Sequence, residues 1–346
     1  MLKKTKKKII ISMSGGVDSS VAAALLKEQG HDLIGIFMHF WSEENVSKDN
    51  VNNKCCSVES FNDARRVAQK LGFPIYTINL DKPFKEKVVD DFIAGYQCGL
   101  TPNPCVNCNK YIKFDLLLKK ADELGYDFIA KGHYAEVQSS KLKVKRNNKY
   151  QLFRPKDLNK DQTYFLYTLT QEKLARIIFP LSNLTKPEVR ELAKKYELDV
   201  AEKHESQEIC FIPEKSHNEF LKRHLKLIPG KIKTLNGEIV GEHQGLPLYT
   251  IGQRKGVEIG GIGPFYVASL DYSTNTLHVV SDGEDKSIYG ERLLVKEVNW
   301  LSGVEPKLPL KCEAVIRYRH KPVGCVITKA PPDKGGWGVE LRIKPP

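Results

Sequence analysis

The sequence predicts an α/β fold, in which residues 1–205 form a doubly wound parallel sheet and the remaining residues are mainly β. Short apolar runs alternate with amphipathic segments throughout the first part. This βαβ rhythm is typical of a parallel sheet with helices on both faces. In the second part Gly and Pro become frequent, and short strands alternate with turns, a pattern typical of a small barrel or sandwich.

Each element is expected from its own pattern. Apolar runs predict the early strands Lys8–Met13, Asp32–His39, Pro74–Asn79 and Phe128–Gly132. Helical spacing predicts Ser19–Gln29, Ser57–Leu71, Lys82–Gly95, Lys113–Leu124 and Lys186–Tyr196. The later strands are expected at Tyr266–Leu270, Thr276–Ser281, Leu294–Trp300, Glu313–Arg317, Gly324–Thr328 and Gly338–Ile343. We therefore expect domains at 1–205, 206–264 and 265–346, the middle one being a small connecting domain.

Composition narrows the class of protein. The 346 residues carry a formal net charge of +12, which favours a polyanionic partner. No apolar run approaches the ~20 residues that span a bilayer, and the lysine-rich start is not followed by a signal-peptide core. We expect a cytoplasmic protein without a membrane partner. In that compartment the eight cysteines serve chemistry or metal binding rather than a disulfide framework.

A glycine-bearing turn joins the first strand to the first helix, with the sequence Ser14-Gly15-Gly16-Val17-Asp18-Ser19-Ser20. Backbone N–H groups and the helix dipole at such a junction attract an anion, and Gly15 and Gly16 let a phosphate approach the backbone. The turn does not match the GxxxxGK[ST] or GxGxxG patterns. A carboxylate at Asp18 suits Mg²⁺ beside phosphates.

Cysteines form the second informative pattern. Cys105 and Cys108 make a Cys-x-x-Cys motif after two prolines, and nearby lysines favour a thiolate there. A structural zinc site needs a second pair with similar spacing, which the sequence lacks. Cys210 stands between Ile209 and Phe211, and by itself such a residue is more often a buried core thiol.

Taken in order, nine motifs give the chain a family resemblance. They are Ser14–Ser20, Gly35–Met38, Thr101–Lys110, Lys131–Tyr134, Lys160–Leu166, Ser206–Ile212, Gly241–Leu246, Thr250–Gly256 and Arg317–Arg319. The set resembles the tRNA-specific 2-thiouridylases over nearly the whole chain. The resemblance implies an N-terminal ATP-pyrophosphatase domain, a small central domain and a C-terminal β-barrel. It also implies ATP-dependent replacement of O2 by sulfur on the wobble uridine of tRNA, with a cysteine desulfurase or a relay protein as sulfur donor.

The resemblance also assigns residues. The nucleophilic cysteine is Cys108, and the persulfide carrier is Cys210. ATP, with Mg²⁺, is expected at Ser12, Met13, Ser14, Gly15, Gly16, Val17, Asp18, Ser19, Met38 and Gly132. The target base is expected at Asn103, Pro104 and Cys105, and the rest of the tRNA at Lys160, Asp161, Gln162, Tyr318 and Arg319.

The proposed chemistry requires two cysteines that approach each other. Adenylation makes the uracil oxygen a leaving group, a persulfide supplies sulfur, and a second thiol releases it. Many members carry Asp where this chain has Cys105, so the general base is unassigned. The same substitution opens an alternative in which Cys105, Cys108 and Cys210 hold a [4Fe–4S] cluster.

The sequence leaves two rival functions open. One is an adenylating synthetase for a small molecule, which leaves Cys108 and Cys210 unexplained. The other is an RNA-binding protein with an inactive ATP fold, against which the intact Ser14–Ser20 turn argues. The family pattern extends past Pro346, so we expect the barrel to lack its last strands.

Overall fold

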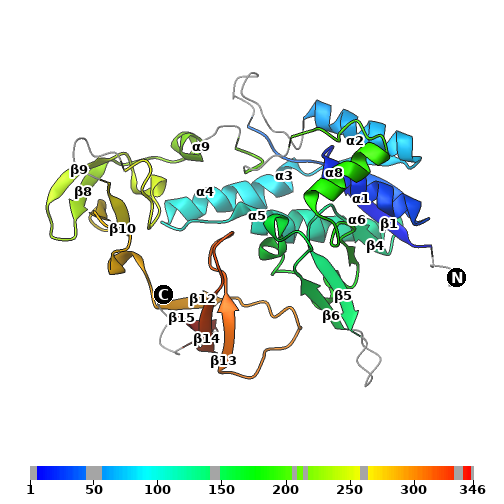
Figure 1. The fold of residues 1–346 in the computed structure, drawn as a ribbon. Helices are drawn as coiled ribbons and strands as arrows, with labels where there is room; N and C mark the ends of the chain where they lie inside the picture. The colour runs from blue at the N-terminus through cyan, green and yellow to red at the C-terminus, as the bar shows by residue number, and fades with distance from the viewer. Residues whose placement is uncertain are drawn as a thin grey trace. The chain divides into compact units, whose positions relative to one another are not determined.

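The structure is a computed structural model that describes residues 6–43, 57–140, 149–204, 209–212, 217–257, 264–330 and 338–343 (Figure 1). The chain divides into two compact units. The first comprises Met1–Val89, Pro104–Lys215 and Asn299–Glu305, and the second comprises Asp90–Asn103, Ser216–Val298 and Pro306–Pro346.

A five-stranded parallel sheet is the centre of the first unit, with the order β3-β2-β1-β4-β7. Its strands are β1 Lys8–Met13, β2 Asp32–His39, β3 Ile75–Asn79, β4 Phe128–Ala130 and β7 Ile177–Ile178. The three isoleucines Ile9, Ile10 and Ile11 of β1 are fully buried, as expected for a strand covered on both faces. The strand order changes direction between β1 and β4, and ligands bind at such switch points.

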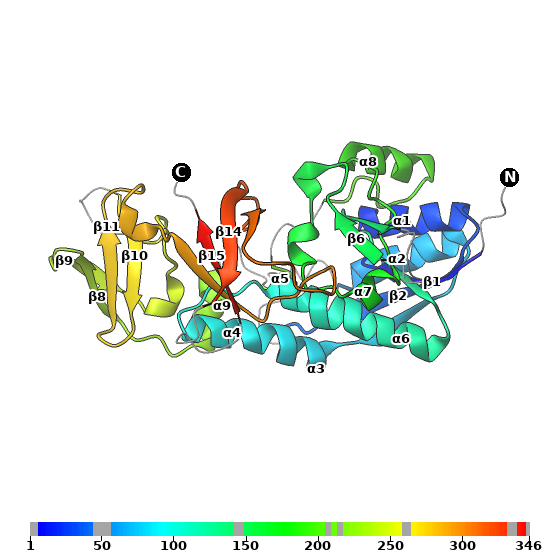
Figure 2. The same ribbon diagram turned by 90° about the horizontal axis from the view of Figure 1, so that it is seen from below.

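Helices flank this sheet (Figure 2). They are α1 Val17–Glu28, α2 Val58–Leu71, α3 Asp81–Phe84, α5 Pro104–Asn107, α6 Leu117–Leu124, α7 Gln171–Leu174 and α8 Lys186–Lys195. Two π-helical segments, η1 Lys85–Val89 and η2 Cys108–Leu116, and two 3₁₀ turns, η3 Leu158–Lys160 and η4 Thr163–Phe165, join them. Helix α1 contacts both α2 and α8, whereas α6 continues directly from η2. A hairpin of β5 Glu136–Ser140 and β6 Lys149–Phe153 completes the unit.

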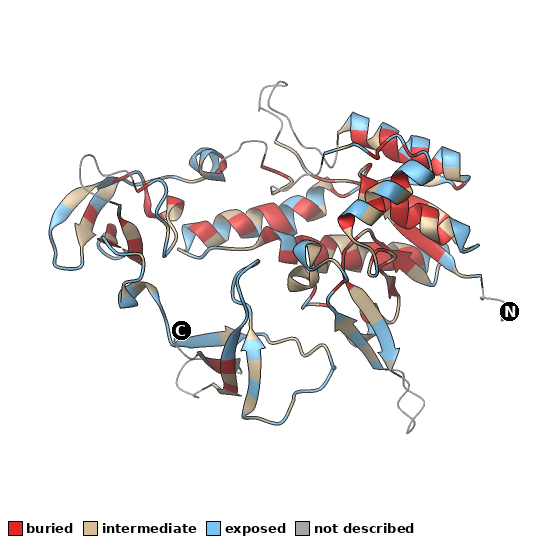
Figure 3. Cartoon of the chain, viewed as in Figure 1, coloured by how far each residue is buried: buried red, intermediate tan, exposed pale blue. Residues whose placement is uncertain are grey.

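The core of the first unit lies between β1, β2 and the helices α1, α2 and α8. Figure 3 shows these strands and the inner helix faces as buried. The doubly wound parallel sheet predicted from the sequence is confirmed. The helix expected at Lys113–Leu124 begins earlier, because helical backbone runs from Pro104 through η2 into α6. Proline at a first helical position lacks an N–H that would have no partner there, so it favours this start.

The second unit contains two four-stranded sheets and the helices α4 Asp90–Gln97 and α9 His217–His224. One sheet has the order β10-β11-β8-β9, with β8 Gly230–Thr234, β9 Ile239–His243, β10 Tyr266–Asp271 and β11 Thr276–Val280. The other has the order β12-β15-β14-β13, with β12 Arg292–Lys296, β13 Leu310–Ala314, β14 Val323–Lys329 and β15 Gly338–Ile343. Short 3₁₀ turns lie at η5 Leu246–Leu248 and η6 Lys286–Ile288.

Strand pairing in the second unit differs from the sequence expectation at three places. Strand β11 pairs with β10 on one side and with β8 on the other, so a boundary at residue 264 divides one sheet. The strand expected at 294–300 ends at Lys296, because Glu297 has a positive φ of 52°. The strand expected at 313–317 lies earlier, at Leu310–Ala314, where it pairs with β14. Local alternation does not specify the partner of a strand, so these features depend on tertiary contacts.

Candidate active site

The turn between β1 and α1 is shaped by a close backbone approach. Gly15 has a φ of 69°, and a Cβ on it would lie 2.1 Å from the carbonyl oxygen of Ser60. Both facts restrict this position to glycine. The turn therefore packs directly against the first turn of α2 and presents its backbone at the carboxyl edge of the sheet.

Serine hydroxyls hold the turn in place. The Ser14 N–H donates to Ser19 Oγ at 3.2 Å, and Ser19 Oγ donates to the Gly16 carbonyl at 3.1 Å. Ser20 Oγ donates to the same carbonyl at 2.9 Å. By contrast, the side chains of Met13 and Val17 are buried in the core. Among the residues predicted for ATP, these two therefore offer a ligand their backbone rather than their side chains.

The carboxylate of Asp18 has two partners from distant segments. Tyr134 Oη donates to Asp18 Oδ1 at 2.9 Å, and Lys186 Nζ lies 2.7 Å from the same oxygen. Gln162 positions Tyr134, because its Oε1 accepts from the Tyr134 N–H at 2.9 Å. The structure thus holds Asp18 in one orientation at the start of α1.

Gly132 follows β4 and lies against the same turn. A Cβ on Gly132 would lie 2.8 Å from the Asp18 carbonyl carbon and 2.8 Å from the Ser19 nitrogen. Met38, near the end of β2, is buried at the same carboxyl edge of the sheet. The structure therefore brings Gly132 and the Ser14–Ser19 turn together at the switch point between β1 and β4.

Cys108 begins η2 and is buried, with 4% of its surface exposed. Oδ1 of the next residue, Asn109, lies 3.1 Å from Nε2 of His133. Lys131, on the other side of Gly132, donates from Nζ to Ser12 Oγ at 3.0 Å. The end of β4 therefore contacts both the cysteine-bearing segment and the strand that leads into the Ser14–Ser19 turn, which we call the phosphate-type turn.

Burial perturbs both basic groups on this segment. Desolvation, followed by the charge of Lys113, lowers the pKa of Lys131 well below its usual range, whereas Cys108 acts in the opposite direction. Desolvation, followed by the charges of Lys113 and Lys131, lowers the pKa of His133 in the same way. Strongly perturbed pKa values of buried groups are typical of functional sites.

Cys210 is half-buried and lies within the described residues 209–212. Its neighbour Phe211 is buried and lies edge-on to Phe84, with ring centroids 5.9 Å apart. Phe84 in turn stacks on Phe40, which follows β2, at 4.9 Å. This aromatic series ties the Cys210 segment to the carboxyl edge of the sheet, near Met38.

The residues predicted to contact the target base differ in exposure. Cys105 is exposed on α5, whereas Pro104 is buried. Asn103 is half-buried and belongs to the second unit. No group of three or more His, Cys, Asp or Glu side chains in the described ranges is arranged to hold a metal ion. Cys105, Cys108 and Cys210, which all fall in those ranges, therefore do not form a ready cluster site.

The predicted tRNA contacts are partly engaged within the protein. Asp161 pairs with Arg154 at 2.6 Å and accepts from the Thr163 N–H at 2.9 Å. Gln162 holds Tyr134, as described above. Lys160 is half-exposed on η3. In the second unit, the Arg319 guanidinium lies 5.3 Å from the centre of the Tyr318 ring.

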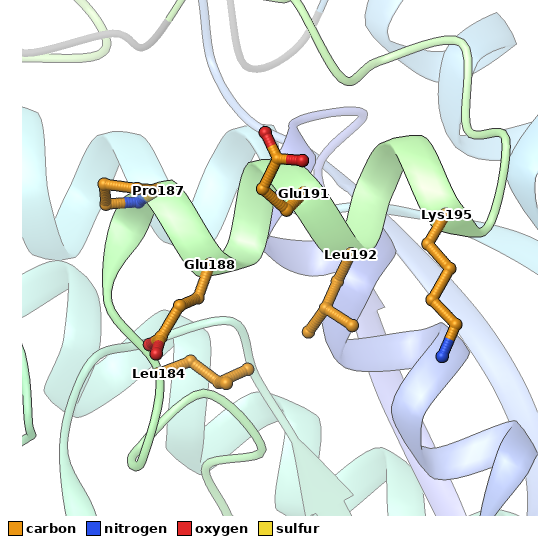
Figure 4. A pocket seen from close by; sticks show the side chains of 6 residues that line it. All are labelled: Leu184, Pro187, Glu188, Glu191, Leu192 and Lys195. Atoms are coloured by element: carbon orange, nitrogen blue, oxygen red, sulfur yellow. The ribbon is translucent and has the colours of Figure 1, made fainter.

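A surface pocket lies along α8 (Figure 4). It is lined by Leu184, Pro187, Glu188, Glu191, Leu192 and Lys195. None of the residues predicted for ATP, sulfur or tRNA lines it.

Sequence reasoning missed three residues of the site, namely Lys131, Tyr134 and Lys186. Lys131 and Tyr134 stand in the quoted Lys131–Tyr134 motif, so their position after a strand was a usable signal. Lys186 opens a helix 168 residues after Asp18, and no local pattern marks it. In the described part of the chain, no helix is long and apolar enough to cross a membrane.

Comparison with known proteins identifies the family. Residues 7–214 match the tRNA methyl transferase HUP domain, 218–281 its PRC-barrel domain, and 290–341 the aminomethyltransferase β-barrel domain. The tRNA-specific 2-thiouridylase MnmA of Carboxydothermus hydrogenoformans is 46% identical over 95% of this chain and 89% of that protein. Its namesake from Geobacter metallireducens is 44% identical over 95% and 88%, and that from Clostridium perfringens 44% over 98% and 92%. The chain therefore belongs to the tRNA-specific 2-thiouridylase family.

Proposed function

We propose that this protein catalyses ATP-dependent 2-thiolation of the wobble uridine of tRNA, with Cys108 and Cys210 as the sulfur-handling residues. One observation carries the proposal: the end of β4 contacts the phosphate-type turn through Gly132 and the Cys108 segment through His133. Nucleotide activation and sulfur chemistry therefore share one edge of the sheet. A small-molecule synthetase would not need the second feature.

The chain's residues fit ATP and Mg²⁺. The Ser14–Gly16 backbone at the N-terminus of α1 suits the phosphates, and the cradle at Gly132 would be filled by any Cβ. Asp18 supplies a carboxylate that suits Mg²⁺, and its contact with Lys186 keeps that carboxylate in place. Magnesium, when bound there, would neutralise charge on the phosphates.

The reaction has two chemical stages. Uridine O2 attacks the α-phosphorus of ATP, which forms an adenylated base and expels pyrophosphate. The Cys108 thiolate then attacks the inner sulfur of a Cys210 persulfide, which forms a Cys108–Cys210 disulfide and releases hydrosulfide. Hydrosulfide adds to C2 of the base and AMP leaves. A thiol reductant restores the two cysteines, and a cysteine desulfurase or relay protein reloads Cys210.

The activity test uses the full chain with ATP, Mg²⁺, unmodified tRNA, a cysteine desulfurase, cysteine and a thiol reductant. Digestion of the tRNA and mass spectrometry are expected to show 2-thiouridine. Cys210→Ser is expected to retain tRNA-dependent pyrophosphate release and to lose 2-thiouridine. Cys98→Ser, which removes an exposed thiol of the second unit, is the matched control. Full thiolation by Cys210→Ser would refute the role of Cys210.

The tRNA-binding assignment has its own test. Lys160→Ala is expected to weaken tRNA binding uniformly across sequences and to reduce the salt slope of log K by about one. Filter binding between 50 and 200 mM salt measures this slope (roughly the range in which phosphate contacts dominate). An unchanged slope removes Lys160 from the proposed interface.

A further inference from the structure

Cys210, the proposed persulfide carrier, lies in a backbone turn. The Ile212 N–H donates to the Ile209 carbonyl at 3.1 Å, so Cys210 and Phe211 lie between the two bonded groups. The side chains of Phe211 and Ile212 are buried, whereas Cys210 is only half-buried. The turn therefore packs its apolar residues into the protein and leaves the cysteine partly exposed.

Phe84 is the aromatic residue against which this turn packs. Its ring lies edge-on to Phe211, with centroids 5.9 Å apart and an interplanar angle of 74°. On another side it stacks on Phe40, at 4.9 Å and 21°. Phe84 is fully buried, and ring pairs in these two arrangements attract each other beyond the effect of burial alone. Phe84 thus links the Cys210 turn to the residue that follows β2.

Helix α3, which carries Phe84, is attached to the end of β2. His39 Nδ1 lies 2.7 Å from Asp81 Oδ1, and the Leu80 N–H donates to the His39 carbonyl at 2.8 Å. The Phe84 N–H donates to the Leu80 carbonyl at 2.9 Å. Groups supported by helices and strands are held more precisely than groups on loops. Phe84 therefore has a fixed base at the carboxyl edge of the sheet, the same edge at which the phosphate-type turn follows β1.

We propose that Phe84 is a positioning residue for sulfur transfer, because its contact with Phe211 keeps the Cys210 turn at this edge of the sheet. Phe84 exchanges no atom, proton or electron with the substrate and acts only through Phe211 and the backbone of the turn. Misplacement of a reacting group by about 1 Å can cost about a hundredfold in rate. This inference rests on the proposed function, in which Cys210 carries the persulfide. Adenylation does not use Cys210, so it is expected not to depend on Phe84.

The test separates sulfur transfer from adenylation in the full chain. Cysteine desulfurase and cysteine load Cys210, free cysteine is removed, and mass spectrometry measures the persulfide so that rates refer to loaded protein. ATP, Mg²⁺ and unmodified tRNA then start a single turnover without reductant, in which 2-thiouridine and pyrophosphate are both followed.

The variants remove one ring at a time. Phe84→Leu keeps an apolar side chain and loses the ring that contacts Phe211, whereas Phe211→Leu removes the other ring of the same pair. Phe73→Leu is the matched control, because Phe73 is a buried phenylalanine of the same unit that precedes β3 at the amino edge of the sheet. Urea unfolding identifies which variants are folded, and Phe211→Leu keeps the test valid if Phe84→Leu unfolds.

Both ring variants are expected to slow single-turnover formation of 2-thiouridine by about tenfold and to leave tRNA-dependent pyrophosphate release unchanged. Phe73→Leu is expected to slow neither step. Hydrogen exchange of the Ile212 amide, followed by peptide mass spectrometry without ATP or tRNA, is expected to be about twofold to tenfold faster in the ring variants, because the lost ring contact makes local opening of the turn easier.

Two results overturn the inference. Wild-type sulfur transfer in a folded Phe84→Leu variant does so even if the Ile212 amide exchanges faster, because the contact is then only structural. Equal losses of sulfur transfer and pyrophosphate release also do so, because the variant has then disturbed adenylation. The proposed function fails separately: if Cys210→Ser still forms 2-thiouridine, the role of Cys210 is refuted and the inference falls with it. If thiolation depends on Cys210 but not on Phe84, the inference alone is refuted.

Discussion

Replacing Gly132 with alanine tests how closely β4 packs against the phosphate-type turn. The added Cβ would lie 2.8 Å from Asp18 C and Ser19 N and 3.0 Å from Asp18 O, all of which are backbone atoms. Gly132 does not have a left-handed φ, so alanine brings no conformational strain of its own. The variant therefore isolates the effect of packing.

The magnitude follows from these distances. Ordinary Cβ contacts begin at 3.4 Å, so the start of α1 must retreat by about 0.6 Å. Overpacking of this kind costs about 1–3 kcal/mol of unfolding free energy. A displacement of this size at the proposed ATP site is expected to lower tRNA-dependent pyrophosphate release by about tenfold to a hundredfold.

Two measurements check this prediction. Urea denaturation gives the change in unfolding free energy, and calorimetric titration with ATP gives the change in affinity. Gly324→Ala is the matched control, because a Cβ there meets nothing within 4 Å and its φ is not left-handed. Wild-type stability together with wild-type ATP affinity in Gly132→Ala would refute the packing argument.

Three further predictions concern other contacts. Lys186→Met leaves Asp18 without its cation and is expected to lower the unfolding free energy by about 2 kcal/mol, as measured by urea denaturation. This loss is smaller than for a fully buried ion pair, because Asp18 is partly exposed. A loss below about 0.5 kcal/mol contradicts the prediction. The lowered pKa of His133 means that the unfolded chain binds its proton more readily, so stability is expected to fall as the pH drops below about 6.5. His133→Gln should reduce that pH dependence of the unfolding free energy. A pH profile of stability identical to that of the wild type would contradict this prediction. Cys312 and Cys325 are cross-strand partners with sulfur atoms 3.4 Å apart. Diamide is therefore expected to join them in a disulfide and to remove both from maleimide labelling. The reaction is expected to be faster above neutral pH, because burial raises the pKa of Cys325 to about 11. Persistent labelling of both thiols would exclude this pairing.

The sequence predicted those parts of the site that depend on local pattern. The turn from Ser14 to Ser19 follows β1, and the apolar run predicted both the first and the last residue of that strand. Gly132 was assigned to ATP binding through the family resemblance, and that role stays a prediction; the contact with Asp18 shows only why a Cβ does not fit there. The assignments of Cys108 and Cys210 to sulfur chemistry remain predictions.

Local pattern left other features of the candidate site unpredicted. The helical backbone around Cys105 and Cys108 was not expected, because the residues there carry no clear amphipathic period. Asp161 was assigned to tRNA, yet its carboxylate also pairs with Arg154 inside the protein. A sequence motif specifies which residues are present but does not separate a ligand contact from an internal one.

By itself, the sequence determined the parallel α/β domain, the glycine turn that suits phosphates and the family. Hydrophobic period, turn residues and motif order are properties of neighbouring positions, so they can be read without a structure. Only the tertiary structure decided that Lys131 meets Ser12 across 119 residues, that Lys186 meets Asp18 across 168, and that β11 pairs with β8. These contacts arise because folding buries each segment against whichever surface completes its packing and hydrogen bonds, and that surface is not encoded locally.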